Sequence, residues 1–181
     1  LEPWRVTTIQ QLTGEFVFPE LSDWQRAVLA RALRFVGYPY VFSGSSEKTQ
    51  KLWSATSATG TVVAPGGFDC SGLIWRVFKL EPFPGAALLP EVLKGRTTYA
   101  MSGEVARPLR IDAPSLTPGD ILFFGSRGPK SKPTEVGHAG IYVGNGWFVH
   151  SAGAGVTLQP LEGWYARTFA WARRPIAEAA L

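Results

Sequence analysis

Cysteine and histidine are rare in this chain, and the few that occur lie in short stretches typical of an active site. The 181 residues include one cysteine, Cys70, and two histidines, His138 and His150. A thiol nucleophile needs a nearby base, and that base needs a third group to hold it in place. We therefore predict that Cys70 is a nucleophile, that His138 is its base and that His150 orients the base.

Cys70 stands at the predicted start of a helix, where a thiol becomes more reactive. It lies in Gly67-Phe68-Asp69-Cys70-Ser71-Gly72-Leu73, directly before an apolar helical pattern. The helix dipole and unpaired backbone N–H groups favour a thiolate, and such sites lower a thiol pKa from about 8.5 to about 3.5–7.5. The same N–H groups can stabilise an oxyanion, and Asp69 is a suitable N-cap. The alternative is a buried, unreactive cysteine that packs as a small hydrophobic residue.

Counting residues around a hairpin tests whether the two histidines can meet. His138 opens one predicted strand, His150 closes the next, and Gly144-Asn145-Gly146 is the turn between them. A three-residue loop pairs Gly140 with His150, so the histidines share a face as diagonal neighbours, about 7–8 Å apart at the backbone. A two-residue Asn145-Gly146 loop places them on opposite faces. The site therefore requires an odd loop length or a compensating bulge; otherwise these are two unrelated strand histidines.

The period of the hydrophobic pattern changes between the two halves of the chain. Ser22-Asp23-Trp24-Gln25 has the spacing of a capping box, which predicts a helix start. Helices first and antiparallel strands afterwards are typical of an α+β domain. We predict helices over residues 23–36, 69–80 and 89–101, and strands over residues 120–124, 138–143, 147–152, 156–161 and 169–174.

Residues 43–67 are rich in Ser, Thr, Gly and Ala, with Trp53 isolated among them. Loops longer than about 15 residues are usually functional or disordered. We expect a long loop or insertion here, with a short helix from about Lys48 to Trp53. Disorder is one interpretation, and a flap beside the active-site cleft is the other.

The composition limits the classes of partner. Eighteen Lys and Arg against fourteen Asp and Glu give a net charge of +4, which favours anionic partners. The basic residues are scattered and no nucleic-acid motif is present, so nucleic acid is not expected. No stretch approaches the roughly 20 apolar residues of a membrane-spanning helix, and no signal peptide is visible. The chain begins at Leu1 rather than Met, which indicates a processed or excised product.

Metal binding is a rival use for cysteine and histidine. The chain offers three such ligands and contains neither HExxH nor a paired CxxC. Asp69 would have to be the fourth ligand, but it is better placed as a helix cap. A Ser–His–Asp hydrolase is also disfavoured, because no Gly-x-Ser-x-Gly motif is present. We expect no metal and no cofactor.

Five segments, in this order, resemble the NlpC-type family of bacterial cell-wall cysteine peptidases, which are papain-like in architecture. The resemblance covers roughly residues 23–175. The matching segments are Tyr40-Val41-Phe42-Ser43-Gly44, Phe68-Asp69-Cys70-Ser71-Gly72-Leu73, Leu116-Thr117-Pro118-Gly119-Asp120-Ile121-Leu122-Phe123-Phe124, Gly137-His138-Ala139-Gly140-Ile141-Tyr142-Val143-Gly144-Asn145-Gly146 and Phe148-Val149-His150-Ser151-Ala152.

The resemblance implies a fold in which N-terminal helices pack on a small antiparallel sheet, with the cleft between them. It implies hydrolysis of amide bonds in peptidoglycan stem peptides, most often between D-γ-glutamate and a diamino acid. The residues that match the family's nucleophile, base and orienting residue are Cys70, His138 and His150. Tyr40 matches a tyrosine whose hydroxyl lines the site and helps to polarise the substrate carbonyl. Asp69 and Ser71 match positions that contact the peptide's amino end in some members, although Asp69 is simply structural in the alternative interpretation.

Two features depart from the family pattern. Phe42-Ser43-Gly44 stands where the family usually has Trp-Gly-Gly, and an insertion over about residues 46–65 separates Tyr40 from Cys70. The segment 125–135 is also long. We expect both insertions to frame the cleft and to alter specificity.

The domain organisation and location follow as expectations. We expect residues 1–22 to be a lead-in, interpreted as the remnant of an upstream region, and residues 23–181 to form one peptidase domain. The resemblance implies a secreted or wall-associated monomer without stable membrane insertion, acting on a stem peptide or muropeptide; cytoplasmic peptide recycling is the alternative. Two rival functions stay open. One is a non-catalytic wall-binding module on the same scaffold, and the other is an amidase or acyltransferase of the same superfamily.

Overall fold

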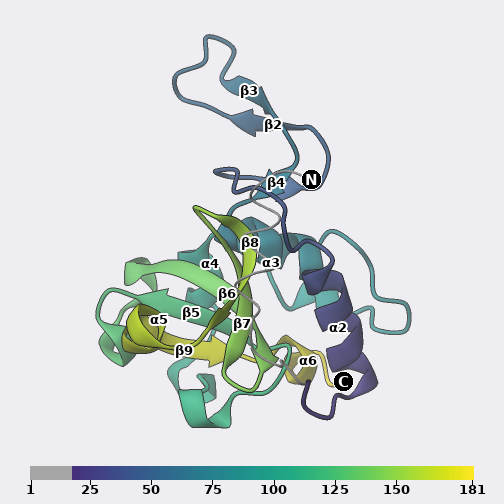
Figure 1. Ribbon diagram of the computed structural model, residues 1–181, viewed down its shortest axis with the longest axis vertical. Helices are drawn as coiled ribbons and strands as arrows, with labels where there is room; N and C mark the ends of the chain where they lie inside the picture. Colours follow the sequence, from purple (N-terminus) through teal and green to yellow (C-terminus); the bar gives the residue numbers. More distant parts are fainter. Residues whose placement is uncertain (1–17) are drawn as a thin grey trace.

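A five-stranded antiparallel sheet, in the order β8-β7-β6-β5-β9, forms the centre of the molecule (Figure 1). The computed structural model describes residues 18–181, so residues 1–17 of the predicted lead-in lie outside the described residues. The α+β class predicted from the sequence is confirmed, and each predicted strand of the second half overlaps an observed one. The strands of this sheet are β5 (Ile121–Gly125), β6 (Val136–Gly144), β7 (Trp147–Ala152), β8 (Gly155–Pro160) and β9 (Phe169–Arg173).

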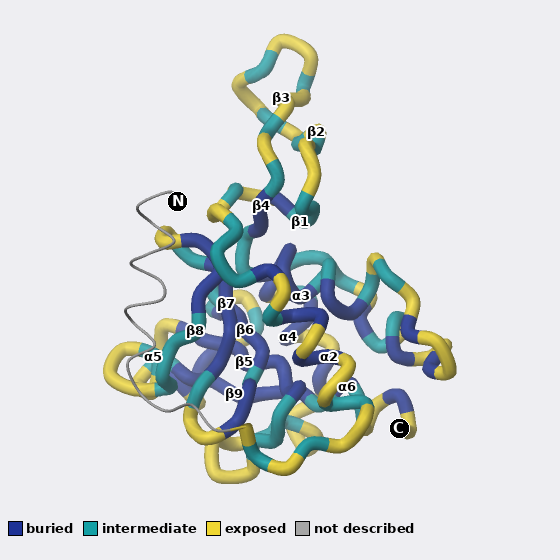
Figure 2. Tube along the Cα trace, turned by 45° about the vertical axis from the view of Figure 1, so that its right-hand side comes forward, coloured by how far each residue is buried: buried dark blue, intermediate teal, exposed yellow. Residues whose placement is uncertain are grey.

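Short helices cover the two faces of the sheet unequally. Side chains alternate along a strand, so neighbouring residues of β5 point to opposite faces of the sheet. Phe123 lies in the main hydrophobic core, together with apolar side chains of the first two helices. Phe124 lies in a second apolar cluster, against which Tyr165 packs. Figure 2 shows the central strands as the most deeply buried part of the chain. The α-helices are α2 (Asp23–Leu33), α3 (Cys70–Phe78), α4 (Thr98–Gly103), α5 (Gly163–Thr168) and α6 (Pro175–Glu178).

Helix α2 begins as its capping box predicts. The Ser22 hydroxyl accepts the backbone N–H of Gln25 at 3.2 Å, and the Gln25 side chain accepts the backbone N–H of Ser22 at 2.9 Å. The helix ends at Leu33, three residues before the predicted end, and the chain then turns toward Gly37, whose φ of +93° favours glycine. The helix packs against α3 and so supports the element that carries Cys70.

The predicted short helix from Lys48 to Trp53 is wrong. The segment forms an antiparallel hairpin of β2 (Gln50–Trp53) and β3 (Thr61–Ala64), which projects from the rest of the molecule (Figures 1 and 2). At its base, β1 (Ser45–Ser46) pairs with β4 (Gly67–Phe68). The Gln50 side chain ties this base together through bonds to the backbone of four residues: Ser45, Ser46, Pro65 and Gly67. Cross-strand pairing between segments eight or more residues apart decided the structure, and local helix propensity did not.

Two other predictions need adjustment. The helix predicted over 89–101 is split into a 3₁₀ helix at Leu89–Glu91, with Pro90 in its first turn, and helix α4, whose new start Thr97 caps. The long segment 125–135 contains two 3₁₀ turns, Gly128–Lys130 and Pro133–Glu135, between β5 and β6. Further 3₁₀ turns lie at Arg107–Leu109 and Ala113–Ser115.

The register of the β6–β7 hairpin decides whether His138 and His150 lie on the same face of the sheet. Gly144 pairs with Trp147, which leaves a two-residue Asn145-Gly146 loop, but the register shifts at Val143. Tyr142 then pairs with Phe148, in the register that a three-residue loop would have given. The compensating bulge that the proposed site requires is therefore present.

None of the helices within residues 18–181 is long and apolar enough to cross a membrane.

Candidate active site

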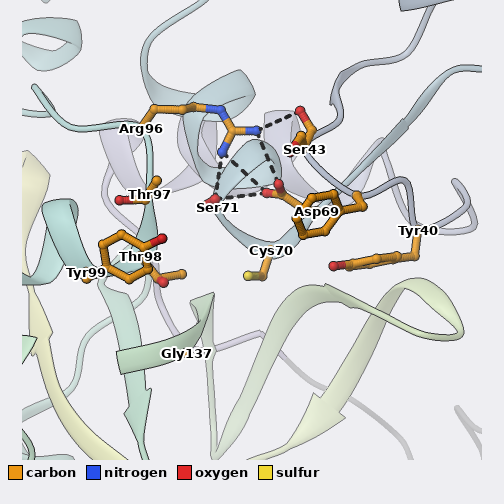
Figure 3. Close-up of a pocket in the computed structure, with 11 residues that line it drawn as sticks. Tyr40, Ser43, Asp69, Cys70, Ser71, Arg96, Thr97, Thr98, Tyr99 and Gly137 are labelled. Carbon is orange, nitrogen blue, oxygen red and sulfur yellow. Dashed lines mark hydrogen bonds and ion pairs between the residues drawn. The ribbon is translucent and has the colours of Figure 1, made fainter. Parts of the chain in front are cut away.

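Cys70 is the first residue of α3 and lines a cavity of about 330 Å³ (Figure 3). The predicted cap is confirmed, because Asp69 Oδ1 accepts the backbone N–H of Gly72. Strand β4 enters the helix directly from its pairing with β1, which fixes the direction of the chain at the thiol. Helix α3 packs against β6 and β7, the two strands that carry the histidines.

The environment of the sulfur favours the neutral thiol. Burial raises the pKa of Cys70 to about 11, and the charge of Asp69 adds to the rise. The backbone N–H groups of Ala139, Ser71 and Cys70 itself act in the opposite direction. The predicted lowering of the thiol pKa is therefore wrong for the resting site, because desolvation of a thiolate outweighs these N–H groups. The N–H of Ala139 also places the sulfur beside β6, one residue after His138.

The two histidines are in direct contact. His138 Nε2 lies 2.7 Å from His150 Nδ1, and the two ring planes are nearly perpendicular, at 85°. Of the two registers considered from the sequence, the one with a compensating bulge gives this juxtaposition. Because Nε2 of His138 contacts His150, the other ring nitrogen of His138, Nδ1, is available for a different hydrogen-bond partner.

Three aromatic rings, Phe124, Phe148 and Tyr165, form an aromatic box around the histidines. Their ring centroids lie 5.7 Å from His138, 4.9 Å from His150 and 5.2 Å from His150, respectively. Burial lowers the pKa of His138 to about 4. It lowers the pKa of His150 to about 3, with His138 as the second cause. Both imidazoles are therefore neutral at neutral pH.

A third polar group extends the histidine pair. Thr157 faces His150 across the β7–β8 ladder, and its hydroxyl lies 3.4 Å from His150 Nε2. A neutral imidazole has one N–H and one acceptor nitrogen. An N–H at His138 Nε2 that donates to His150 Nδ1 leaves His138 Nδ1 free to take a proton, while the N–H of His150 points to Thr157. The order His138, His150, Thr157 can thus fix the tautomer of His138.

Tyr40 lies at the mouth of the cavity and is 40% exposed. Its hydroxyl points toward Cys70 in Figure 3, and a backbone bridge to Phe68 holds the residue near the thiol. Burial, followed by the charges of Cys70 and Asp69, raises the pKa of Tyr40. The hydroxyl therefore stays protonated and can donate a hydrogen bond into the cavity.

An arginine that the sequence reasoning missed completes the cavity. Arg96 Nη1 donates to the Ser71 hydroxyl at 2.6 Å and lies 3.3 Å from Asp69 Oδ1. Its Nη2 donates to the backbone carbonyls of Ser43 and Gly44 at 3.3 and 3.2 Å. Arg96 stands in an irregular loop without a recognisable motif, so no local pattern points to it. Thr157 could have been found by continuing the strand register from His150.

The structure therefore places the predicted residues in two adjoining groups. Around the cavity lie Tyr40, Asp69, Cys70 and Ser71. His138 and His150 lie in the strands against which α3 packs. Within residues 18–181, no three or more His, Cys, Asp or Glu side chains are grouped so as to hold a metal ion.

The chain belongs to the NlpC/P60 family, whose model matches residues 37–174. It is 33% identical over 145 residues to a probable endopeptidase of Mycobacterium tuberculosis, an alignment that covers 80% of this chain and 28% of that protein. It is 30% identical over 146 residues to the bifunctional muramidase/DL-endopeptidase CwlT of Bacillus subtilis, covering 80% of this chain and 34% of that protein. The chain thus spans about a third of the length of these relatives.

Solved structures share the papain-like fold of this family. The P60 domain of an antigen from Mycobacterium avium subspecies paratuberculosis has a TM-score of 0.58 at 24% identity, over 84% of this chain and 94% of that one. RipD of Mycobacterium tuberculosis, described as a non-catalytic NlpC/p60 domain protein adapted to peptidoglycan binding, has a TM-score of 0.54 at 21% identity, over 85% of this chain and 98% of that one. The family therefore contains members of this fold with and without catalysis.

Proposed function

We propose that this domain is a cysteine peptidase that hydrolyses amide bonds in peptidoglycan stem peptides. The bond we assign is the one between D-γ-glutamate and a diamino acid. The observation that carries the proposal is the position of Cys70 at the tip of α3, in a cavity, beside the strand whose His138 is held by His150. The names of the relatives, endopeptidase and DL-endopeptidase, support the same bond class.

The resting pair is a neutral thiol and a neutral imidazole, so His138 acts as a general base during attack. Its Nδ1 takes the Cys70 proton as the sulfur adds to the scissile carbonyl, which gives a tetrahedral oxyanion. The backbone N–H of Cys70 and the Tyr40 hydroxyl stabilise that oxyanion; one such donor is typically worth about 2.7–4 kcal/mol. His138 then gives its proton to the leaving amine, and the C–N bond breaks to leave a thioester.

Water completes the cycle. His138 takes a proton from a water molecule as the water adds to the thioester carbonyl, and the C–S bond then breaks as His138 returns that proton to the sulfur. The products are the free carboxylic acid of the substrate and the Cys70 thiol. His150 keeps His138 in the required tautomer and shares the positive charge that the base acquires.

Asp69 and Ser71 fit a structural role better than direct substrate contact. Asp69 caps the helix and Ser71 is buried beneath Arg96. The organisation proposed for the chain is one peptidase domain over residues 23–181, acting as a secreted or wall-associated monomer; cytoplasmic peptide recycling is the alternative location. The insertion over about 46–65, which is the β2–β3 hairpin, and the segment 125–135 are proposed to frame the cleft.

Defined muropeptides and mass spectrometry test the proposal. We expect the wild-type chain to release fragments cut after D-γ-glutamate, and Cys70→Ala to release none while keeping its circular dichroism and melting temperature. If Cys70→Ala cleaves stem peptides normally, the nucleophile is another group.

Two rival functions have distinct outcomes in the same assay. A wall-binding module, as RipD is described, would retain muropeptides without any product. An amidase or acyltransferase would act on another bond and give fragments of different mass. The intact set of Cys70, His138 and His150 favours the peptidase.

A further inference from the structure

A second cavity, of about 550 Å³, lies between two loops and shares no lining residue with the cavity beside Cys70. Among its lining residues within 18–181, four side chains carry a positive charge and none carries a negative charge. The lining residues are Arg107, Arg110, Arg127, Pro129, Lys130 and Ser131. A concave surface of one charge sign attracts ligands of the opposite sign, so this cavity attracts anions.

Both loops are anchored to β9, the strand at one edge of the central sheet (Figure 1). Directly after the 3₁₀ turn Arg107–Leu109 and Arg110, Ile111 exchanges backbone hydrogen bonds of 3.0 and 2.8 Å with Ala172 of β9. The turn Gly128–Lys130 of the other loop also packs against β9. Segments distant in the chain are thus held in place as the two walls of the cavity.

Most of the positive charge in this cavity has no acidic partner. Within residues 18–181, Arg107, Arg110 and Lys130 form no ion pair. Arg127 lies 3.8 Å from Glu135, and both side chains remain partly open to solvent. The cavity therefore retains a surplus of positive charge that a bound anion can neutralise.

The chain neutralises its more buried arginines elsewhere. Arg173 forms ion pairs with Glu104 and Glu178, and Arg174 forms an ion pair with Asp120. Like charges that lie together without a counter-ion repel one another, which is unfavourable unless a ligand supplies the negative charge. The uncompensated cluster is therefore particular to this surface.

Arg110 is held in an orientation that suits a ligand. Its guanidinium lies 3.6 Å from the centroid of the Trp171 ring, and stacking on an aromatic face fixes the planar group. Its Nε donates to the Val105 carbonyl at 3.4 Å, while neither Nη group has a partner within residues 18–181. Burial, followed by the charge of Arg107, lowers the pKa of Arg110. An anion beside the guanidinium would favour its charged form.

We infer that this cavity binds a phosphodiester polymer, with arginine N–H groups and the Ser131 hydroxyl donating to phosphate oxygens. A tetrahedral phosphate presents oxygens in several directions, so it can accept from both loops, and the arginine fork matches it bidentately. Ser131 is 4% exposed; its oxygen accepts the Arg127 N–H at 3.0 Å, and its own O–H makes no hydrogen bond within residues 18–181. Two arginines can hold one phosphate, so four cations suit successive phosphates along a chain.

Two other anionic partners fit these loops less well. Proteins that bind single-stranded nucleic acid stack its bases on aromatic side chains, but no aromatic residue lines this cavity and Trp171 is 2% exposed. A membrane surface favours a broad apolar face beside the basic residues. Leu109, at 71% exposure, is the one large apolar side chain that is exposed on the two loops, 105–111 and 125–135.

Calorimetry at low salt with a synthetic poly(glycerol phosphate) oligomer tests the inference on the full chain. We expect the wild type to bind and Arg107→Gln/Arg110→Gln to bind roughly tenfold more weakly or worse. Arg107→Gln alone should weaken binding without affecting the melting temperature, because Arg107 is exposed and its side chain has no partner within residues 18–181. Arg110→Lys should also weaken binding, because lysine keeps the charge but lacks the planar fork.

Lys48→Gln/Lys51→Gln is the matched control. It removes the same two charges from exposed side chains in the segment 46–65, outside this cavity, and should bind as the wild type does. An equal loss of affinity in both double variants would mean that net charge alone attracts the polymer, and the inference would be overturned.

Three further probes separate phosphodiester binding from other anion binding. Equal affinity for poly-L-glutamate of the same charge would overturn the assignment of phosphate. Tighter binding of single-stranded DNA would indicate a nucleic-acid site, and tighter binding of anionic phospholipid vesicles that Leu109→Ser abolishes would indicate a membrane site; each overturns the inference. These measurements do not involve Cys70, so their outcome is independent of the proposed peptidase.

Discussion

His150 Nδ1 lies 2.7 Å from His138 Nε2, and the bulge at Val143 brings the two rings to the same face of the sheet. Without that extra residue, the two-residue Asn145-Gly146 loop would send the side chains to opposite faces. One unpaired residue in a hairpin therefore decides whether the His138 and His150 rings can meet.

Removing the His150 imidazole should impair catalysis while the fold persists. We expect His150→Ala to lower kcat by roughly 10²–10⁴-fold, because His138 loses its tautomeric lock and the support for its positive charge. His150→Asn should retain more activity, since its amide oxygen can accept from His138 Nε2. Steady-state kinetics with a muropeptide gives both values, and circular dichroism controls for folding. A kcat within twofold of wild type for His150→Ala would remove His150 from the mechanism.

The buried histidines should make the folded state sensitive to acid. Their folded pKa values, about 4 for His138 and about 3 for His150, lie below the ordinary value near 6.5. The unfolded chain then binds more protons between these limits, so stability is full above pH 6.5 and falls as the pH decreases. For His150, which is 1% exposed, the slope approaches about 1.4 kcal/mol per pH unit.

Urea unfolding at several pH values between 7.5 and 4.5 measures this slope. His150→Gln is the control, because glutamine does not titrate and the dependence should become shallower. An equal slope in wild type and variant would mean that other groups dominate acid unfolding.

The thiol should react slowly with alkylating agents at neutral pH. Since burial raises the Cys70 pKa to about 11, the rate of iodoacetamide labelling should rise about tenfold per pH unit through pH 10. Mass spectrometry of the intact chain follows the labelling, and Cys70→Ala gives the blank because it has no other cysteine. A rate that is flat from pH 5 to pH 8 would indicate a pre-formed thiolate–imidazolium pair instead of general-base attack.

A side chain at Gly140 should disturb the histidine pair. A Cβ there would lie 2.6 Å from the Phe148 ring, 2.9 Å from the Val149 carbonyl oxygen and 3.2 Å from His150 Cβ. We expect Gly140→Ala to destabilise the fold by about 1–3 kcal/mol and to lower kcat. Gly153→Ala is the matched control, because the space around Gly153 is open. Thermal melts compare the two variants. Equal melting temperatures would show that the hairpin accommodates the added methyl group at position 140 without losing stability.

The β2–β3 hairpin should matter for substrate choice more than for stability. Its outer face includes Trp53 at 76% and Val63 at 71% exposure, so little core is lost when it is removed. Replacing residues 52–62 with an Asn-Gly turn keeps Gln50 and the base of the hairpin. We expect a melting temperature within a few degrees of wild type and a changed ratio of activity on polymeric wall to activity on a short peptide. An unchanged ratio would exclude the hairpin as part of the cleft.

Local sequence patterns determined the elements and several of their ends. The capping box at Ser22, the cap at Asp69 and the turn at Gly144-Asn145-Gly146 are short-range signals, because each joins groups within a few residues of one another. They placed Cys70 at a helix tip and the histidines in adjacent strands. The resemblance in five ordered segments then predicted the family.

Tertiary structure decided what depends on contacts distant in the chain. The β2–β3 hairpin exists through pairing between its strands, which a helical interpretation of Lys48 to Trp53 could not reveal. Arg96 reaches Asp69 from 27 residues away, and no spacing rule connects them. The pKa of Cys70 depends on how much solvent the packed helix and sheet exclude. Burial, charge pairing and register are properties of the assembled fold, and for that reason the candidate reactive groups were visible in the sequence while their protonation was not.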